Sequence, residues 1–260
     1  MMDTDTVSAG DTSAPETGKP FVLLFSGGLD STLEVVERMK THREAHLLTF
    51  NNGYCINTQG SLKRASEMKE RFGADRIKQS LINTKPLMQT ILEDFKALWR
   101  EYRSPLIVDM GCKMASVTEL ILYAKKNRIE EISDGASVDQ TQVFIQHPEF
   151  SAHIRPLMEA HGLRFLRPVL FDIGREEKIA KLKSLGFDRG SKTLEKLHIT
   201  SQLKHQPFCL VGFSTFFFTS PLRKIPLVQR YDLPMDQAKN LWDALLPRAT
   251  AYLEARLAEA

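Results

Sequence analysis

The sequence predicts an α/β protein with a doubly wound, mainly parallel sheet and a short helical C-terminal region. Short apolar runs of strand length alternate along the chain with segments of helical periodicity, which is typical of repeated strand-helix-strand units. A length of 260 residues, 42% of them hydrophobic and 26% charged, leaves room for one large domain or a domain with a smaller appendage. These values exclude a disulfide-stapled miniprotein, a fibre and a wholly disordered chain.

The N-terminal half contains the first strand-helix units. Residues 21–25 (FVLLF) form the first expected strand, and residues 31–41 form the helix that follows a Ser-Gly-Gly turn. Residues 45–50 (AHLLTF) are the second expected strand. Helices are expected at 61–72 and at 85–102, where apolar residues recur every three or four positions.

The pattern continues with a helix at 113–127 and a short strand at 129–132 that ends in Ser-Asp-Gly-Ala. A strand at 164–169 and a helix at 175–185 complete a further unit, and Gly186 occupies the usual position after a helix C-terminus. In doubly wound sheets, ligands bind beyond the carboxyl ends of the strands, so the loops after these strands are expected to face one crevice.

Three regions are expected along the chain: a disordered tail at 1–19, an α/β domain at 20–187, and a basic, helical region at 188–260 for acceptor binding or oligomerisation. Between residues 187 and 231, seven Lys or Arg residues stand against two acidic ones. This excess fits a phosphate or RNA surface and equally a solvated face. The last part of the chain is expected as two helices divided at Pro247.

Charge and cysteine content say little about partners. A formal net charge of +3 is too small to imply a nucleic-acid-binding protein. An odd count of three cysteines at unrelated spacings indicates a reducing, cytoplasmic compartment. The tail has no apolar block and no basic leader, so we expect neither a secretory nor a mitochondrial signal. No run of about 18 apolar residues is present, and no membrane span is expected.

The strongest motif follows the first strand, where residues 26–32 read SGGLDST and open a helix. Two glycines let the backbone approach an anion, and successive N–H groups at a helix N-terminus supply donors and positive potential. Hydroxyl groups of Ser26, Ser31 and Thr32 add further donors. The spacing is neither that of a Walker loop nor that of a dinucleotide fingerprint. The motif therefore indicates a pyrophosphate cradle of another kind.

SGGLDS resembles the PP-loop of the ATP pyrophosphatase superfamily (adenine nucleotide alpha hydrolase-like), whose members cleave ATP between its α and β phosphates. The resemblance implies an adenine nucleotide alpha hydrolase-like fold and ATP as cofactor. It also implies that Asp30 helps to hold Mg²⁺, an ion that prefers oxygen ligands. The residues that it implies for the phosphates are Ser26, Gly27, Gly28, Asp30, Ser31 and Thr32.

The same resemblance assigns the rest of the nucleotide site. The end of the second strand, Thr49, Phe50 and Asn51, is implied to contact the adenine. The loop after the strand at 129–132 is similar to the family's fourth-strand loop, where a Gly and a later Asp line the nucleotide. These residues are Gly135 and Asp139, and an ordinary turn remains the alternative for them.

Two cysteines are candidates for the chemistry that follows adenylation. Cys112 precedes Lys113 at the expected start of a helix, where the helix-end potential and the lysine both favour the thiolate. Cys209 lies in the basic segment. Two such thiols fit a persulfide carrier and its resolving partner, and they equally fit buried, inert side chains.

The cysteine pair is similar to the sulfur-inserting branch of the superfamily. In tRNA 2-thiouridylases the later Cys lies in a comparable setting, here Cys209-Leu210-Val211-Gly212. The sacrificial sulfur transferases of nickel-pincer cofactor synthesis share a Cys-Lys dipeptide and a Pro-containing segment that ends in Cys-Leu. The resemblance implies an enzyme that forms AMP and pyrophosphate and activates an acceptor oxygen for sulfur transfer. The acceptor is then a tRNA base or a small-molecule carboxylate, and the sulfur comes from the protein's own Cys or from a persulfide carrier.

Several alternatives stay open. Cys55, Cys112 and Cys209 match in number the ligands of a [4Fe–4S] cluster with one open iron, but no two are close in sequence, which disfavours a cluster. Asp109 replaces the first Cys of a Cys-x-x-Cys pair. The main alternative enzyme is one similar to 7-cyano-7-deazaguanine synthase, which forms an amide or nitrile but has a late four-cysteine zinc site absent here. A non-catalytic adenine-nucleotide-binding module is the third possibility, and the aromatic run at 216–218 is compatible with a homo-oligomer.

Overall fold

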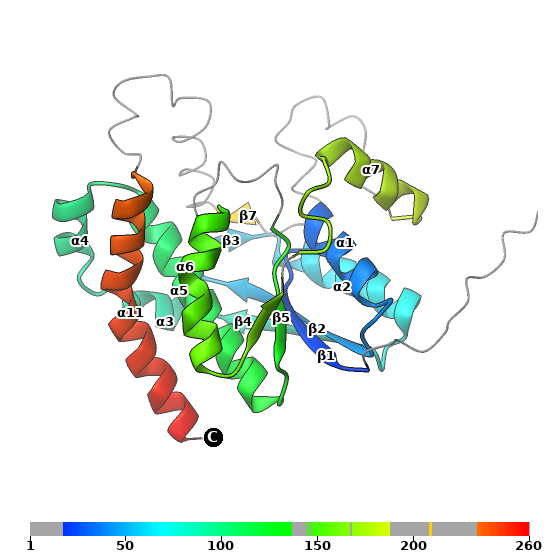
Figure 1. The fold of residues 1–260 in the computed structure, drawn as a ribbon, viewed down its shortest axis with the longest axis horizontal. Helices are drawn as coiled ribbons and strands as arrows, with labels where there is room; N and C mark the ends of the chain where they lie inside the picture. The colour runs from blue at the N-terminus through cyan, green and yellow to red at the C-terminus, as the bar shows by residue number, and fades with distance from the viewer. Residues whose placement is uncertain are drawn as a thin grey trace, which may run out of the picture.

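The computed structural model describes residues 18–136, 145, 147–166, 168–187, 208–209 and 233–259, and of residues 208–209 it describes only the backbone. Five parallel strands form one sheet in the order β4-β2-β1-β5-β6 (Figure 1). The expected doubly wound α/β class is therefore confirmed. The strands are β1 (Pro20–Leu24), β2 (Glu44–Asn51), β4 (Ile77–Asn83), β5 (Glu131–Ser133) and β6 (Arg164–Leu166).

Helices cover both faces of the sheet because successive strand residues point to opposite sides. In β1, Phe21 and Leu23 pack into one apolar core and Val22 into the other. The helices of the first core are α1 (Leu29–Arg38), α2 (Thr58–Phe72) and α7 (Arg175–Ser184). The helices of the second core are α3 (Lys85–Ile91), α4 (Phe95–Tyr102), α5 (Leu106–Lys126), α6 (Pro148–Ala160) and α11 (Met235–Ala258).

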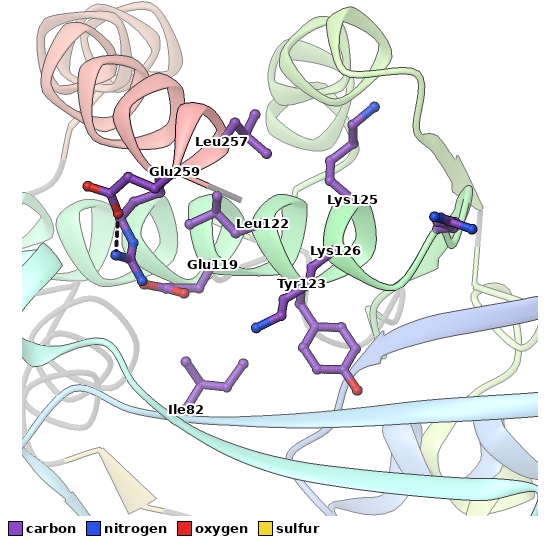
Figure 2. A pocket seen from close by; sticks show the side chains of 10 residues that line it. Ile82, Glu119, Leu122, Tyr123, Lys125, Lys126, Leu257 and Glu259 are labelled. Carbon is purple, nitrogen blue, oxygen red and sulfur yellow. Dashed lines mark hydrogen bonds and ion pairs between the residues drawn. The ribbon is translucent and has the colours of Figure 1, made fainter.

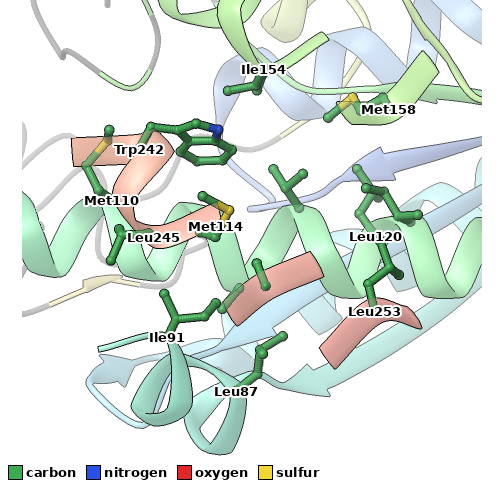
Figure 3. Close-up of a cluster of buried hydrophobic side chains, with 14 of the residues drawn as sticks. Leu87, Ile91, Met110, Met114, Leu120, Ile154, Met158, Trp242, Leu245 and Leu253 are labelled. Carbon is green, nitrogen blue, oxygen red and sulfur yellow. The ribbon is translucent and has the colours of Figure 1, made fainter. Parts of the chain in front are cut away.

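The second core is built around α5, as Figure 3 shows. Trp242 of α11 is buried against Phe150 of α6, with the ring centroids 5.2 Å apart in an edge-to-face arrangement. Leu245 and Leu253 of α11 lie over the same surface of α5. The C-terminal helix thus shares a hydrophobic core with the α/β sheet.

Two helix predictions need correction. The expected division at Pro247 is wrong: α11 is one helix from Met235 to Ala258 with Pro247 inside it. Apolar side chains on both sides of the proline are buried in one core, and this burial outweighs a cost of about 3 kcal/mol for an interior proline. The expected single helix at 85–102 is two helices, α3 and α4, with a turn at 92–94. Arg248 of α11 binds the carboxylates of both acidic residues in this turn.

Other elements were not expected. The strand β4 reads IKQSLIN, and helix α6 precedes β6. A second, two-stranded antiparallel sheet joins β3 (Cys55–Ile56) to β7 (Phe208–Cys209). In the part of the chain that the structure describes, no helix is both long and apolar enough to span a membrane. The tail and most of the basic segment, including the aromatic run at 216–218, lie outside the described residues.

Candidate functional site

The loop between β1 and α1 is shaped to hold an anion. Gly27 has a φ of +72°, in the left-handed region that favours glycine, and α1 begins directly after Gly28. The Gly28 N–H donates to Ser26 Oγ at 3.3 Å, and the Thr32 N–H donates to the Gly28 carbonyl at 3.0 Å as the first helical bond. The first N–H groups of α1 are therefore directed into this loop, where a phosphate oxygen is a suitable acceptor.

The hydroxyl groups of the loop interact with one another. Ser26 Oγ and Ser31 Oγ are 3.2 Å apart, and Ser31 Oγ donates to the Gly28 carbonyl at 3.4 Å. Thr32 Oγ1 donates to the Gly27 carbonyl at 3.4 Å from a fully buried position. These contacts are long, so the Ser26 and Ser31 hydroxyls can turn to a phosphate oxygen at little cost. Thr32 differs from them in being fully buried beneath the loop.

Asp30, in the first turn of α1, is paired with a lysine from a distant helix. Lys178 Nζ of α7 donates to Asp30 Oδ1 at 2.9 Å. The Lys178 side chain is only 1% exposed. Burying an ammonium group is costly unless a carboxylate accompanies it, so the pair holds α7 against the PP-loop. The structure thereby adds a buried positive charge to the expected phosphate site.

A buried carboxylate, Glu34, connects three elements behind the loop. Its Oε1 accepts from Ser133 Oγ of β5 at 2.7 Å and from Arg38 Nε at 2.5 Å, and its Oε2 accepts from the Val169 N–H at 2.8 Å. Burial raises the pKa of Glu34, and the bonds from Arg38, Ser133 and Val169 oppose this rise. The network attaches α1 to β5 and to the segment that leads into α7.

The loop after β5 lies directly against the PP-loop. A Cβ atom at Gly135 would come within 2.8 Å of the Ser31 backbone nitrogen, so glycine is needed for this close approach. Beside it, Lys113 Nζ of α5 lies 3.5 Å from Asp134 Oδ2. The expectation that Gly135 lines the nucleotide is compatible with this contact and stays a prediction, and Asp139 lies outside the described residues.

At the end of β2, the three residues expected near the adenine have different environments. Thr49 is buried, and its Oγ1 donates to the Phe25 carbonyl at 2.9 Å and contacts Ser61 Oγ at 3.0 Å. Its side chain therefore joins β1 to α2. Phe50 is partly buried beside the second core, and Asn51 Oδ1 accepts from a backbone N–H at 2.9 Å. The adenine contacts of this strand end stay a prediction.

The environment of Cys112 differs from the one expected. Helix α5 begins at Leu106 because Ser104 Oγ accepts from the Leu106 N–H at 3.2 Å and Pro105 precedes the first turn. Cys112 consequently lies in the second turn of α5, and the argument from a helix N-terminus does not apply to it.

The Cys112 sulfur is contacted by the side-chain amide of Asn52 and not by a helix N-terminus. Asn52, buried just after β2, donates from Nδ2 to Cys112 Sγ at 3.0 Å. Its Oδ1 accepts from the Tyr54 N–H at 2.9 Å and from Cys55 Sγ at 3.2 Å. The bond from Tyr54 fixes the orientation of the amide, since a backbone N–H requires an oxygen opposite it. One side chain therefore contacts two cysteines.

Strand β7 places the backbone of the third cysteine, Cys209, beside that of Cys55. Cys209 and Cys55 are opposite partners in the antiparallel β3·β7 pair. The structure thus brings together three cysteines that are far apart in sequence. Among the side chains that it describes, which do not include that of Cys209, no group of three or more His, Cys, Asp or Glu residues is placed to hold a metal ion.

A separate cavity of about 720 Å³ lies along the C-terminal half of α5, shown in Figure 2. Leu122, Tyr123 and Lys126 of α5 line it together with Leu257 of α11 and Ile82 of β4. None of the residues that line the cavity belongs to the loops after β1, β2 or β5, so the cavity is distinct from the candidate nucleotide site.

Sequence reasoning missed Asn52, Lys178 and Glu34, and it considered Cys55 only as a cluster ligand. A polar Asn-Asn-Gly turn directly after a strand was the one available signal for Asn52. Lys178 lies in a helix whose composition is that of a solvated surface helix, and nothing local marks it as buried.

Comparison with solved structures supports the fold. The chain superposes on a 4-thiouridine synthetase, solved as an RNA complex with bound ATP, with a TM-score of 0.54 and 17% sequence identity over 93% of this chain and 54% of that chain. The chain has a doubly wound α/β fold of the adenine nucleotide alpha hydrolase-like type. The resemblance predicted from SGGLDS is thus confirmed at the level of the fold, and the chain spans about half the length of the synthetase.

Two other matches are weaker. A predicted subunit of tRNA methyltransferase from Methanocaldococcus jannaschii has a TM-score of 0.43 and 16% identity over 74% of this chain and 96% of that one. The NMN synthetase from Francisella tularensis has a TM-score of 0.46 and 14% identity over 85% of this chain and 89% of that one. Both TM-scores are below 0.5, so neither match supports the fold. No protein-family profile and no curated protein sequence matches the chain.

Proposed function

We propose that the protein is an ATP-dependent adenylating enzyme that forms AMP and pyrophosphate while it activates an acceptor oxygen, and that a cysteine then delivers sulfur to the acceptor. The observation that supports this most is the juxtaposition of two sites. The PP-loop follows β1, and the Asn52 amide that contacts Cys55 and Cys112 follows β2, the parallel neighbour of β1. An activated acceptor and a thiol would meet at this edge of the sheet.

In the first step, the acceptor oxygen attacks the α-phosphorus, and pyrophosphate leaves with the bridging oxygen. Negative charge develops on that leaving group. The first N–H groups of α1, the Ser26 and Ser31 hydroxyls and the Lys178 ammonium are positioned to stabilise it. Because Lys178 is already buried and oriented, little reorganisation is needed when the charge appears.

Asp30 would hold Mg²⁺ beside the phosphates, since its carboxylate lies in the first turn of α1. In the described structure this carboxylate is paired with Lys178. A Mg²⁺ ion would supply a further positive charge on the same side of the phosphates, so Lys178 would then pair with phosphate oxygen in place of Asp30.

In the second step, the sulfur comes from Cys112 or Cys209 and displaces AMP. Donation from Asn52 Nδ2 to Cys112 Sγ favours the thiolate of Cys112. The acceptor would be a tRNA base or a small-molecule carboxylate, bound by the basic region at 188–260. A persulfide carrier or one of the protein's own cysteines would supply the sulfur.

The test is AMP and pyrophosphate formation from Mg-ATP in the presence of candidate acceptors. Ser31→Ala should lower the rate about a hundredfold, because it removes a donor from a preformed loop. Ser66→Ala is the matched control: its hydroxyl donates to a carbonyl within α2 on the exposed surface. Equal rates for wild type and Ser31→Ala would refute the assignment of the loop.

The same assay separates the two alternatives. If AMP formation requires ammonium and survives replacement of all three cysteines by serine, the nitrogen-using branch replaces the sulfur-inserting one. If ATP binds but no acceptor yields AMP, the protein is a nucleotide-binding module. A [4Fe–4S] cluster would need all three thiolates, and bound iron that disappears in each single Cys→Ser variant would establish it.

A further inference from the structure

The β3·β7 ribbon places Cys55 opposite Cys209. Directly opposite residues of antiparallel strands have Cα atoms about 4.5 or 5.5 Å apart. Disulfides join residues whose Cα atoms are about 4.4–6.8 Å apart. The backbone register alone therefore gives Cys55 and Cys209 the spacing of a bonded pair.

Cys112 does not have this relation to Cys55. The Asn52 amide lies between them, 3.0 Å from Cys112 Sγ and 3.2 Å from Cys55 Sγ. A Cys55–Cys112 disulfide would remove the thiol hydrogen that Cys55 donates to Asn52 Oδ1, so this hydrogen bond would be lost if that pair formed.

We propose that Cys55, and not Cys112, is the resolving thiol for a persulfide on Cys209, an inference that rests on the proposed sulfur transfer. The Cys55 side chain is itself partly exposed, so an acceptor and a reductant can reach it. The Cys55 thiol donates to Asn52 Oδ1 at 3.2 Å, a hydrogen bond that holds it beside the end of β2.

The step balances as follows in the absence of an acceptor. The Cys55 sulfur attacks the inner sulfur of the Cys209 persulfide, the persulfide S–S bond breaks, and the outer sulfur leaves as hydrogen sulfide with the proton of Cys55. The Cys55 sulfur is oxidised to the disulfide level, the outer sulfur of the persulfide is reduced to sulfide, and the Cys209 sulfur keeps its oxidation state. With an acceptor, the outer sulfur first displaces AMP, and Cys55 then releases the thiolated product. A dithiol reductant must reduce the Cys55–Cys209 disulfide before the next turnover.

The experiment uses the full-length, reduced protein and needs no acceptor. Sodium polysulfide is added to load persulfide, excess reagent is removed, and released sulfide is measured while cysteine linkages are mapped under non-reducing conditions. Trypsin places the cysteines on three different peptides, 44–63, 104–113 and 205–223. We expect a Cys55–Cys209 linked peptide in the wild type. In Cys55→Ser, sulfide release should fall more than about tenfold, and Cys209 should keep an extra sulfur atom.

Cys112→Ser is the comparison variant, and in it the Cys55–Cys209 peptide should still form. A Cys112–Cys209 linkage, or sulfide release that is lost in Cys112→Ser but kept in Cys55→Ser, would overturn the proposal. So would the absence of any persulfide on Cys209, or stoichiometric iron binding that requires Cys55. AMP formation by the wild type is measured separately, so that failure of the adenylation proposal is distinguished from failure of this one.

Discussion

Replacing Gly135 by alanine should impair ATP cleavage, because the loop after β5 rests on the backbone of the PP-loop helix. The new Cβ would lie 2.8 Å from the Ser31 nitrogen and 2.9 Å from the Ser31 Cα. Contacts between such atoms are comfortable at about 3.5 Å, so the two segments must separate by about 0.6–0.7 Å. Both sides of the contact are backbone, and no flexible side chain can move aside.

This separation sets the size of the expected effect. Overpacking of this kind costs about 1–3 kcal/mol of stability. A displacement approaching 1 Å in a catalytic loop can cost about a hundredfold in rate, so a fall in kcat/KM of about 10- to 100-fold is expected for Gly135→Ala. The assay measures pyrophosphate release from Mg-ATP, together with thermal unfolding of the same preparation.

Gly162→Ala is the matched control for Gly135→Ala. Gly162 has a φ of +71° in the turn between α6 and β6, and a Cβ there meets no atom within 4 Å. It should cost about 1–2 kcal/mol of stability through backbone strain, with pyrophosphate release unaffected. Wild-type activity and stability in Gly135→Ala would refute the proposed contact. Parallel losses of activity in both variants would attribute the effect to stability alone.

The remaining predictions concern charges and the C-terminal helix. Lys178→Met should lower kcat/KM about a hundredfold, because the Lys178 ammonium contacts Asp30 in the PP-loop. Lys181→Met is its control. It removes a partly exposed ion pair with Glu37, two turns farther along α1, and should change kcat/KM less than about threefold. Burial alone would raise the pKa of Glu131, but hydrogen bonds from His42 and Arg164 hold this pKa below 4.5. The ionised Glu131 therefore stabilises the folded protein above about pH 4.5. This stabilisation is lost as the pH falls through the lower pKa of the folded state. Glu131→Gln should therefore lower Tm at pH 7 and make Tm less dependent on pH below 4.5; an unchanged acid limb would contradict this. Pro247→Ala should raise Tm by about 2–8 °C without altering ATP cleavage, and a fall in Tm would show that the proline fits α11 without cost.

The parts of the fold that the sequence predicts are those with local signals. The strand at 21–25, the glycine turn and helix α1 follow from apolar runs and from the motif itself. Strand β4 was not predicted because it lies at the edge of the sheet, where only Ile77 of its sequence IKQSLIN is fully buried. An edge strand needs few apolar residues, and its composition is close to that of a loop.

The supporting residues of the site could not be predicted for a different reason, which is the distance along the chain to their partners. Lys178 and Asp30 are 148 residues apart, Ser133 and Glu34 are 99 apart, and Asn52 and Cys112 are 60 apart. Each of these residue types is ordinary at an exposed position. Their importance arises only when parallel strands bring their carboxyl ends to one edge of the sheet.

The cysteines show how much depends on register. Cys112 and Cys209 were paired because they resemble the cysteines of the sulfur-inserting branch, and a helix start was expected at Cys112. Helix α5 instead begins at Leu106. In the structure the Cys112 sulfur instead accepts a hydrogen bond from the Asn52 amide. The same amide accepts a hydrogen bond from Cys55, while the β3·β7 register sets Cys55 against Cys209. A shift of that register by one residue would place Cys209 opposite a different residue, and the assignment of the resolving thiol depends on that single backbone pairing.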